Sequence, residues 1–369
     1  MKPKQTRKIQ KLLDFWQSSL PLNERLQRSI DQSFMIDFNY NSNHLEGNTL
    51  TYGQTKLLLL FGRVEGKGLM RDFEEMKAHN VGLEMMKIEA LDKKRPLSEA
   101  FIRELNRTIL AGDFYKLSQD GEYRYKIHTG VYKTRPNSVI TPSGEIFDYA
   151  SPEETPSMMG DLVKWYNKCE KNKTLSVIEL AALFHYRYIR IHPFEDGNGR
   201  IARLLVNYIL LRHGYPMLVI PTEDRKNYLN ALSECDRITG KEPYNGANAT
   251  TEQITVFVDY IADYLEKKLV FVEQIITGKI REITETGKKQ QKIPSNVPVN
   301  VLANVHLNDT EKYILKLISD NPRITYNEIA KEIYMNRKTA QRNIEKLKAS
   351  GLLKRVGADK NGYWEINGQ

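Results

Sequence analysis

From Arg7 to about Leu110 the chain shows the apolar spacing of amphipathic helices. Apolar residues there recur at intervals of three and four positions, as at Leu83 and Met86, and this spacing gathers them on one face of a helix. Strand-like alternation is scarce in the same stretch. We therefore predict a helical section over residues 1–110.

The pattern changes between Gly121 and Pro152. Tyr, Val, Ile and Thr residues alternate there with the turn signals Arg135-Pro136-Asn137 and Pro142-Ser143-Gly144. Runs of β-branched and aromatic residues bounded by Pro, Gly and Asn are typical of strands joined by turns. We expect one short β-hairpin within 121–150.

Helical periodicity returns over 155–167 and 176–191, breaks at His192-Pro193 and resumes over 198–213, with Gly214 as the end signal. Further along, a polar stretch rich in Gly, Lys, Gln, Pro and Asn is typical of a linker. The expected organisation is a helical section at 1–110, a core at 111–284, a linker at 285–305 and a tail domain at 306–369.

The tail has the pattern of a winged helix-turn-helix. Three helical stretches, 309–320, 326–333 and 337–350, precede two apolar runs, 352–356 and 363–366. The Asn361-Gly362 pair between these runs is a strong signal for a tight hairpin turn. Apolar positions in the tail can form one small core, and the hairpin would be the wing.

Composition places the chain among ordinary folded proteins, with 40 % hydrophobic and 27 % charged residues. No run approaches the roughly 20 apolar residues of a membrane span, and the first residues lack an apolar signal core. We expect a cytoplasmic protein with no membrane partner, in which Cys169 and Cys235 stay reduced. The net charge of +9 favours polyanionic partners such as nucleic acid or nucleotide phosphates.

The densest chemistry lies in the run His-Pro-Phe-Glu-Asp-Gly-Asn-Gly-Arg-Ile-Ala-Arg, from His192 to Arg203. Pro193 disfavours the α conformation for the residue before it, so the imidazole should project from a loop. Gly197 and Gly199 allow a tight loop that leads into a helix N-terminus, where free N–H groups attract anions. The run therefore predicts a phosphate-binding loop.

Charged side chains around this loop suit a polyphosphate with a metal ion. Arg200 and Arg203 share a helix face and can hold phosphate oxygens. Asp196 supplies the hard oxygen ligand that Mg²⁺ uses beside substrate phosphates. His192 titrates near neutrality and can act as a general base. Each feature taken singly also has a structural explanation, such as a helix cap or a solvated face, but together they favour a nucleotide with Mg²⁺.

The run resembles the signature of the Fic family, His-x-Phe-x-Asp/Glu-Gly-Asn-Gly-Arg-x-x-Arg, at every defined position. The resemblance implies an all-α Fic fold with a small β-hairpin flap. It implies an enzyme that transfers AMP from ATP to a Ser, Thr or Tyr hydroxyl of a protein target or of itself, releasing pyrophosphate. ATP and Mg²⁺, or Mn²⁺ in its place, are then the cofactors, and a homodimer is an expected assembly.

The resemblance also implies roles for single residues. His192 would deprotonate the target hydroxyl, Asp196 would hold Mg²⁺, and the hairpin would lie over the nucleotide and pair with the target segment. Tyr228 is a candidate for adenine contact, with a purely structural core position as the equal alternative. The residues expected to bind the nucleotide are Gly197, Asn198, Gly199, Arg200, Arg203 and Tyr228.

Ser42-Asn43-His44-Leu45-Glu46-Gly47 resembles the inhibitory motif of the same family. The resemblance implies that Glu46, with Ser42 beside it, pairs with Arg203 and takes the place of the outer phosphate. In isolation such a run would indicate a helix start with no regulatory meaning. The same glutamate suggests a second reaction, in which a water that it positions removes AMP from the target.

The tail leaves two alternatives open. Its third helix would carry Arg337, Lys338, Thr339 and Arg342 toward the major groove of duplex DNA, but winged helices also dock proteins or dimerise. A rival function follows, in which a DNA-binding transcriptional regulator uses the Fic core as a nucleotide sensor. A third alternative keeps the chemistry with a different nucleotide donor.

Overall fold

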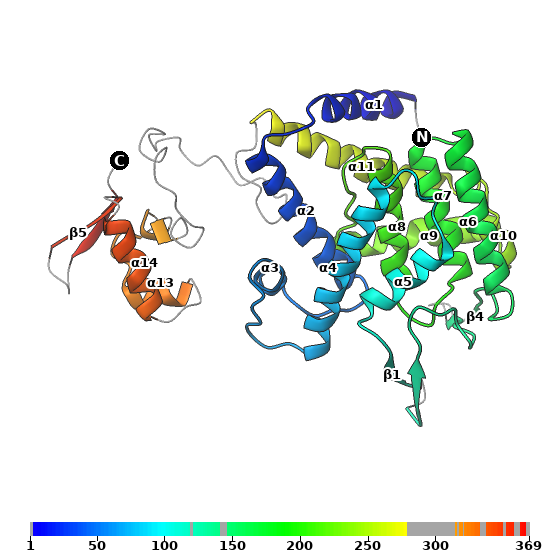
Figure 1. Ribbon diagram of the computed structural model, residues 1–369, viewed down its shortest axis with the longest axis horizontal. Coiled ribbons are helices and arrows are strands. Elements are labelled where there is room, and N and C mark those ends of the chain that lie inside the picture. Colours follow the sequence, from blue (N-terminus) through cyan, green and yellow to red (C-terminus); the bar gives the residue numbers. More distant parts are fainter. Residues whose placement is uncertain are drawn as a thin grey trace. The chain divides into compact units, whose positions relative to one another are not determined.

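Figure 1 shows a computed structural model of the chain, which forms two compact units, residues 1–285 and 286–369. Each unit is considered by itself. The expected linker 285–305, most of the expected helix 309–320 and the turn residues 142–144 and 361 lie outside the described residues. The structure describes residues 3–118, 121–140, 146–278, 314–315, 317–319, 321–332, 337–349, 352–357 and 362–366.

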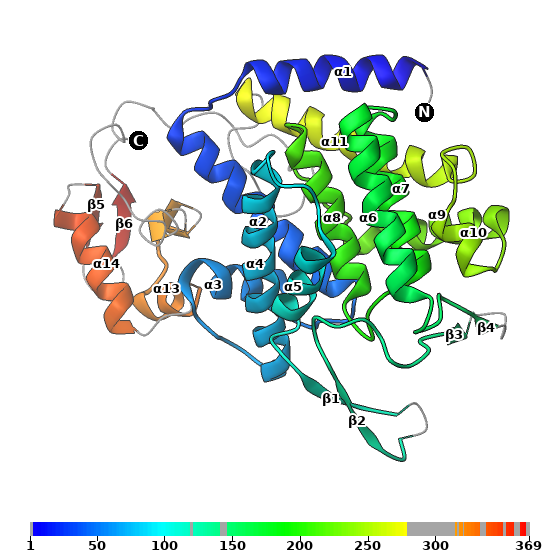
Figure 2. The ribbon, with the colours of Figure 1, turned by 45° about the vertical axis from the view of Figure 1, so that its right-hand side comes forward.

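The first unit is helical, as the apolar spacing predicts. Its front section ends at residue 109, and the later helices form the body around α7 and α8 (Figure 2). The front helices are α1 (Pro3–Ser18), α2 (Glu24–His44), α3 (Tyr52–Phe61), α4 (Met70–Leu91) and α5 (Glu99–Ile109). The later helices are α6 (Thr155–Asn172), α7 (Val177–Ile191), α8 (Asn198–Arg212), α9 (Arg225–Thr239), α10 (Pro243–Ala247) and α11 (Thr255–Ile276), with a 3-10 turn at Thr222–Asp224.

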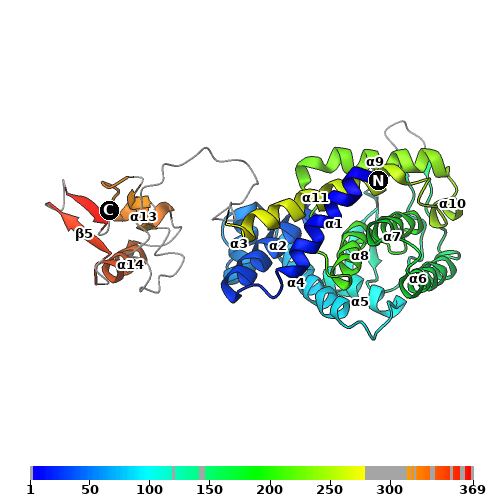
Figure 3. The ribbon, with the colours of Figure 1, turned by 90° about the horizontal axis from the view of Figure 1, so that it is seen from above.

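Helices α7 and α8 form the centre of this unit (Figure 3). Ser176 caps α7 through a reciprocal capping box with Glu179, which satisfies N–H groups that a helix start leaves free. Both helices are buried on nearly all sides, as expected of helices whose apolar residues are not confined to one stripe. The loop between them is therefore held by two rigid, packed elements.

The strands differ from the expectation of one hairpin within 121–150. The described residues of the first unit contain two antiparallel hairpins, one pairing β1 (Phe114–Leu117) with β2 (Arg124–Ile127) and the other pairing β3 (Val139–Ile140) with β4 (Ile146–Phe147). Strand β1 lies before the predicted segment. The sequence did not predict it because three of its four residues are exposed, so it has no alternation of buried and exposed positions. The β1–β2 hairpin projects from the helical body (Figure 2).

A buried arginine joins α7 to the segment that follows α9. The Arg190 side chain is 1 % exposed and lies 3.1 Å from Asp236. Its guanidinium also donates to the hydroxyl of Thr239 and to the carbonyls of residues 240, 241 and 242. A buried charge is tolerated when it is paired and hydrogen-bonded in this way. The network holds the end of α7 just before the loop 192–197 that connects it to α8.

The second unit has the elements of a winged helix. Its described helices include α13 (Tyr326–Glu332) and α14 (Arg337–Ala349), and β5 (Leu353–Val356) pairs antiparallel with β6 (Tyr363–Ile366). Trp364 is buried and donates from its indole nitrogen to Ile324 O at 2.9 Å. The predicted strand runs and the small apolar core are confirmed. Among the described helices, none combines the length and hydropathy that crossing a membrane requires.

We predict that Arg190→Leu lowers the free energy of unfolding by about 3–5 kcal/mol, because it leaves Asp236 and three carbonyls without their buried donor. Urea unfolding followed by circular dichroism measures the change. Arg237→Leu is the matched control, since Arg237 is exposed on α9 and pairs with Glu234 at 2.7 Å; its cost should stay below about 0.5 kcal/mol. Equal costs for the two variants would contradict the structural role of Arg190.

Candidate active site

His192 occupies the sharp corner between α7 and α8. Helix α7 ends at Ile191, and His192 has φ 52° and ψ 60°, in the left-handed region. This conformation is uncommon for a residue other than glycine and is found where the surrounding structure enforces it. The predicted exclusion of the α conformation before Pro193 is confirmed, and the imidazole leaves the helix axis at this corner.

The environment of His192 favours its neutral form. Its ring stacks on Tyr149, with centroids 4.0 Å apart and an interplanar angle of 19°. Burial, with the Lys133 ammonium nearby, lowers the pKa of His192 to about 4. An imidazole with this pKa is unprotonated at pH 7 and can accept a proton.

The glycine loop is closed by Asn198. The Asn198 amide donates to Phe194 O at 2.7 Å, and Phe194 N donates back to its Oδ1 at 3.0 Å. The buried side chain of Asn198 is used within the loop, and its part in anion binding stays a prediction. Gly197, at φ 83°, is the N-cap of α8, and backbone N–H groups at such a helix N-terminus can bind an anion.

Asp196 lies between two cations at the edge of the loop. Its Oδ2 is 3.3 Å from the Nζ of Lys116 on β1, and its Oδ1 is 3.3 Å from Arg200. Burial raises the pKa of Asp196, but Lys116 and Arg200 outweigh it and hold this pKa below its usual value. Arg200 is buried and also pairs with Glu75 on α4 at 3.2 Å.

The residues fit a nucleotide with a divalent cation. The Nε of buried Arg200 has no hydrogen-bond partner among the described residues, so a donor is available for an anion. Among the described residues, no three or more His, Cys, Asp or Glu side chains lie close enough together to hold a metal ion by themselves. Mg²⁺ commonly uses one or two carboxylates plus substrate phosphates, and Asp196 supplies such a carboxylate.

Arg203 is held by the front section of the chain. Its guanidinium donates to Ser42 Oγ at 3.1 Å and to Ser42 O at 2.8 Å. It also forms an ion pair with Glu46 at 2.7 Å. The structure thus brings Ser42 and Glu46, from the end of α2, to the arginine that the sequence motif assigns to phosphate binding.

Glu46 also lies over the glycine loop. A Cβ added at Gly199 would collide with Glu46 Oε1, so a negatively charged oxygen lies against the start of α8. Burial raises the pKa of Glu46, but Arg203, with Arg200 behind it, outweighs burial and lowers this pKa. The carboxylate is therefore charged at neutral pH, and 37 % of its side chain remains exposed.

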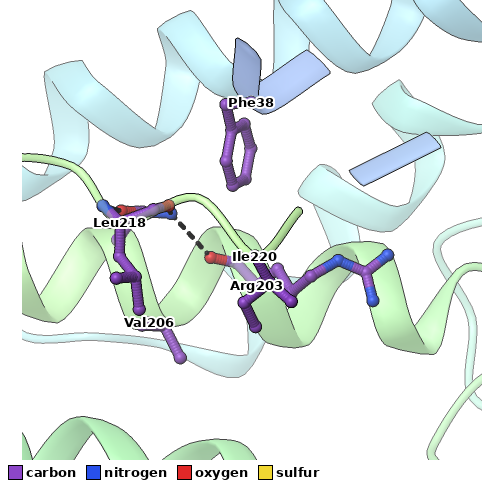
Figure 4. Close-up of a pocket in the computed structure, with 6 residues that line it drawn as sticks. Phe38, Arg203, Val206, Leu218 and Ile220 are labelled. Atoms are coloured by element: carbon purple, nitrogen blue, oxygen red, sulfur yellow. Dashed lines mark hydrogen bonds between the residues drawn. The ribbon is translucent and has the colours of Figure 1, made fainter. Parts of the chain in front are cut away.

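A small, mostly apolar pocket is lined in part by Arg203 (Figure 4). Phe38 of α2 faces α8 and the 217–220 segment across it (Figure 4). The Asn207 amide donates to Arg203 O within α8 and to Leu218 O, so it joins α8 to the 217–220 segment. The lining residues are Phe38, Arg203, Val206, Asn207, Leu218 and Ile220. The pocket therefore marks a seam between α2 and α8 and offers few polar groups to a nucleotide.

Tyr228 lies in the core of the first unit. It is buried, and its hydroxyl is 2.8 Å from His185 Nε2. Phe257 and Tyr260 pack against its ring. The hydroxyl also hydrogen-bonds with Arg203, and the contact of Tyr228 with adenine stays a prediction.

Sequence reasoning missed two neighbours of the site. Lys116 reaches Asp196 from an unpredicted strand, and Glu195, the variable position of the motif, contacts Arg135 at 3.3 Å. Charge at these positions gave no signal, because isolated charged residues are common on any surface. The segment 133–137, which includes the predicted turn Arg135-Pro136-Asn137, lies against the loop 192–197 through Lys133 and Asn137.

The candidate DNA-binding residues open α14. Arg337 and Arg342 are exposed. The side chains of Lys338 and Thr339 lie outside the described part of the structure. Contact of these arginines with DNA stays a prediction.

Two family models match the chain. Residues 96–210 match the Fic/DOC family, and residues 307–354 match the winged helix-turn-helix DNA-binding family. Protein adenylyltransferase fic-1 of Caenorhabditis elegans is 33 % identical over 209 residues, 56 % of this chain and 37 % of that protein. Protein adenylyltransferase Fic of Drosophila willistoni is 30 % identical over 283 residues, 74 % of this chain and 50 % of that protein. The chain thus spans half or less of these relatives.

Solved structures extend the similarity. The crystal structure of a Fic domain containing signaling protein from Bacteroides thetaiotaomicron VPI-5482 is 55 % identical, with a TM-score of 0.71, covering 75 % of this chain and 100 % of that one. Fic-1 from C. elegans has 28 % identity and a TM-score of 0.58 over 75 % of this chain and 73 % of that one. A Fic family protein from Desulfovibrio desulfuricans G20, 18 % identical with a TM-score of 0.57, shares the fold over 100 % of this chain and 97 % of its own.

We predict that the pKa of His192 is about 4 in the folded chain, well below the value of about 6.5 for a free imidazole. The midpoint is read from the C–H resonances of the ring by NMR, and His192→Ala identifies the signal. Because the folded pKa lies below the unfolded one, protonation favours unfolding, so this residue reduces stability as the pH falls from about 6.5 toward 4. A midpoint between pH 6 and 7 would contradict the burial seen here.

Proposed function

Because the chain belongs to the Fic/DOC family, we propose that residues 1–285 form a protein adenylyltransferase that transfers AMP from ATP to a Ser, Thr or Tyr hydroxyl of a protein. The observation that carries this proposal is a neutral, half-buried His192 on the same short loop as the glycine N-terminus of α8. A base and an anion-binding site so close together suit attack of a hydroxyl on a phosphate.

In the proposed reaction His192 takes the proton of the target hydroxyl. The hydroxyl oxygen then forms a bond to the α-phosphorus of ATP, the bond from that phosphorus to the β-bridging oxygen breaks, and pyrophosphate leaves with the electron pair. Backbone N–H groups at the start of α8 stabilise the charge on the α-phosphate. A positioned general base typically contributes a factor of about 10²–10⁴ to the rate.

Asp196 is the residue that would hold Mg²⁺ at this site. When bound there with phosphate oxygens, the ion would neutralise charge that develops on pyrophosphate. Lys116, now paired with Asp196, comes from the β1–β2 hairpin. This contact supports a flap role for the hairpin, in which it lies beside the nucleotide and holds the target segment in line with the α-phosphate.

Glu46 supports autoinhibition as part of the same proposal. Its carboxylate holds Arg203 and lies over Gly199, so it competes for the positive charge that outer phosphates need. Negative charge placed there disfavours productive ATP binding through repulsion. The same carboxylate, partly exposed and beside the loop, is also placed to hold a water, which would hydrolyse the AMP–target bond.

We predict that Glu46→Gly raises AMP transfer tenfold or more, because it frees Arg203 and removes negative charge from the phosphate site. The measurement follows label from α-³²P-ATP into protein, with Mg²⁺ and then Mn²⁺, in the presence of cell lysate. Ser42→Ala removes one hydrogen bond to Arg203 and should give a smaller gain. Glu46→Gln, which keeps the shape without the charge, should lie between wild type and Glu46→Gly.

The double variant Glu46→Gly/His192→Ala is the control and should abolish transfer. If Glu46→Gly transferred no more AMP than wild type under every metal condition, autoinhibition would be refuted. No label in any lane, together with duplex binding, would favour the rival function of a regulator that senses a nucleotide. Competition by unlabelled nucleotides other than ATP would reveal a different donor.

We propose that the second unit binds duplex DNA through the start of α14. The support is the match to the winged helix-turn-helix DNA-binding family and the exposure of Arg337 and Arg342. Basic side chains at the start of the second helix of this motif contact bases and phosphates. Protein docking by the same unit is the alternative.

We predict that the full chain binds duplex DNA with an affinity that falls steeply between 50 and 200 mM salt, because phosphate contacts release counterions. Arg337→Ala and Arg342→Ala should each weaken binding several-fold in a fluorescence-anisotropy titration. Lys348→Ala is the matched control, since Lys348 lies at the far end of α14 and pairs with Glu345 at 3.0 Å. A salt-independent or absent signal would point to protein docking instead.

A further inference from the structure

The segment 133–137, which lies outside the sequence motif, forms hydrogen bonds with the loop that carries His192. The backbone N–H of Lys133 donates to Pro193 O at 2.8 Å. Its ammonium donates to Ile191 O at 3.1 Å and to Asn137 Oδ1 at 2.8 Å. Lys133 is 3 % exposed, so these bonds are shielded from water and each is costly to break.

Asn137 continues this grip on either side of the proline. Its amide donates to His192 O at 3.2 Å and to Phe194 O at 2.9 Å. The successive carbonyls of residues 191 to 194 therefore all accept hydrogen bonds from Lys133 or Asn137. The backbone on both sides of the imidazole is fixed, which enforces the left-handed conformation of His192.

The same segment is anchored beside the loop by Glu195. The carboxylate accepts from Thr134 N at 3.3 Å and from Arg135 at 3.3 Å. The Arg135 guanidinium lies 4.1 Å from the centroid of the Tyr125 ring on β2. The segment thus links the catalytic loop to the β1–β2 hairpin, and we call residues 133–137 the loop clamp.

The charge of Lys133 is the unusual part of the clamp. Among the described residues no carboxylate forms an ion pair with it, and the acceptors of its ammonium are the neutral oxygens of Ile191 and Asn137. Burial lowers the pKa of Lys133 to about 8, and the charge of Glu154 opposes this shift. A buried cation without an ion pair is costly to keep. At His192 the charge of Lys133 adds to burial in lowering the imidazole pKa, while Glu46 and Asp196 act in the opposite direction.

We propose that Lys133 and Asn137 are positioning residues for His192: together they fix the backbone on both sides of the imidazole. The charge of Lys133 has a second, electrostatic role, because it adds to burial in favouring the neutral form of His192. This inference rests on the proposed function for its effect on catalysis. Neither residue is assigned to contact the nucleotide. The clamp would therefore act on the rate of transfer and leave ATP binding nearly unchanged.

The test uses full-length chains that carry Glu46→Gly. Lys133→Gln keeps a hydrogen-bond donor and removes the charge, while Asn137→Ala removes two carbonyl contacts and leaves the charge. Lys164→Gln is the matched control, because Lys164 is 82 % exposed on α6. For each chain kcat and the KM for ATP are measured across pH, and the His192 titration is followed by NMR without nucleotide.

Both clamp variants should lower kcat tenfold or more with the KM for ATP changed less than twofold. Lys133→Gln should also raise the His192 midpoint by at least one pH unit, which Asn137→Ala and Lys164→Gln should not do. An unchanged His192 midpoint in Lys133→Gln would overturn the electrostatic role. An unchanged kcat in Asn137→Ala would overturn the positioning role.

The two proposals fail in distinguishable ways. If the Glu46→Gly parent transfers no AMP, the proposed function fails, but the NMR titration still tests whether Lys133 controls the protonation of His192. If Lys133→Gln lowers the melting temperature by more than the control does, Asn137→Ala carries the kinetic test. Lys133→Arg, which keeps both charge and donor, should restore the low His192 midpoint; a midpoint that stays high would contradict the electrostatic role.

Discussion

The corner between α7 and α8 is the constraint on which the site depends. Pro193 ends α7, and the chain turns within a few residues into α8, so His192 adopts a left-handed conformation that its own preferences disfavour. Strain of this kind persists where the surroundings over-determine it. Two buried helices hold the ends of the corner, and Arg190, Asn198 and the loop clamp hold its middle. The rigidity of the base thus depends on hydrogen bonds from residues distant in sequence.

Electrostatics at the site depend on cations that are paired with carboxylates of the same chain. Arg203 pairs with Glu46, and Lys116 pairs with Asp196. Arg200 pairs with both Asp196 and Glu75. The same cations that would hold phosphates therefore stabilise the closed front section. A nucleotide and Glu46 cannot both satisfy Arg203 fully, and this competition is the physical basis of the proposed autoinhibition.

Sequence patterns predicted the helical fold, the winged helix and the run 192–203, because helical periodicity and a compact motif are local signals. Strand β1 was missed because its exposed residues show no alternation. A motif fixes residue identity and not hydrogen-bond partners, so the sequence did not show that the side chain of Asn198 closes the loop. The burial of Tyr228 likewise depends on packing against residues distant in sequence, such as Phe257 of α11. Asn137 was predicted only as part of a turn and Lys133 was given no role, since their contacts with the loop span more than 50 positions.

The clamp and the Glu46–Arg203 pair differ in how far their side chains are exposed to water. Lys133 is 3 % exposed, whereas the Glu46 side chain keeps 37 % of its surface in water. In the proposed autoinhibition, a phosphate that displaced Glu46 would leave buried Arg203, which is 4 % exposed, paired with a new anion. The buried donors of the clamp have no such replacement partner, so they cost more to remove. Arg203 would therefore change partners while the clamp holds His192 in place.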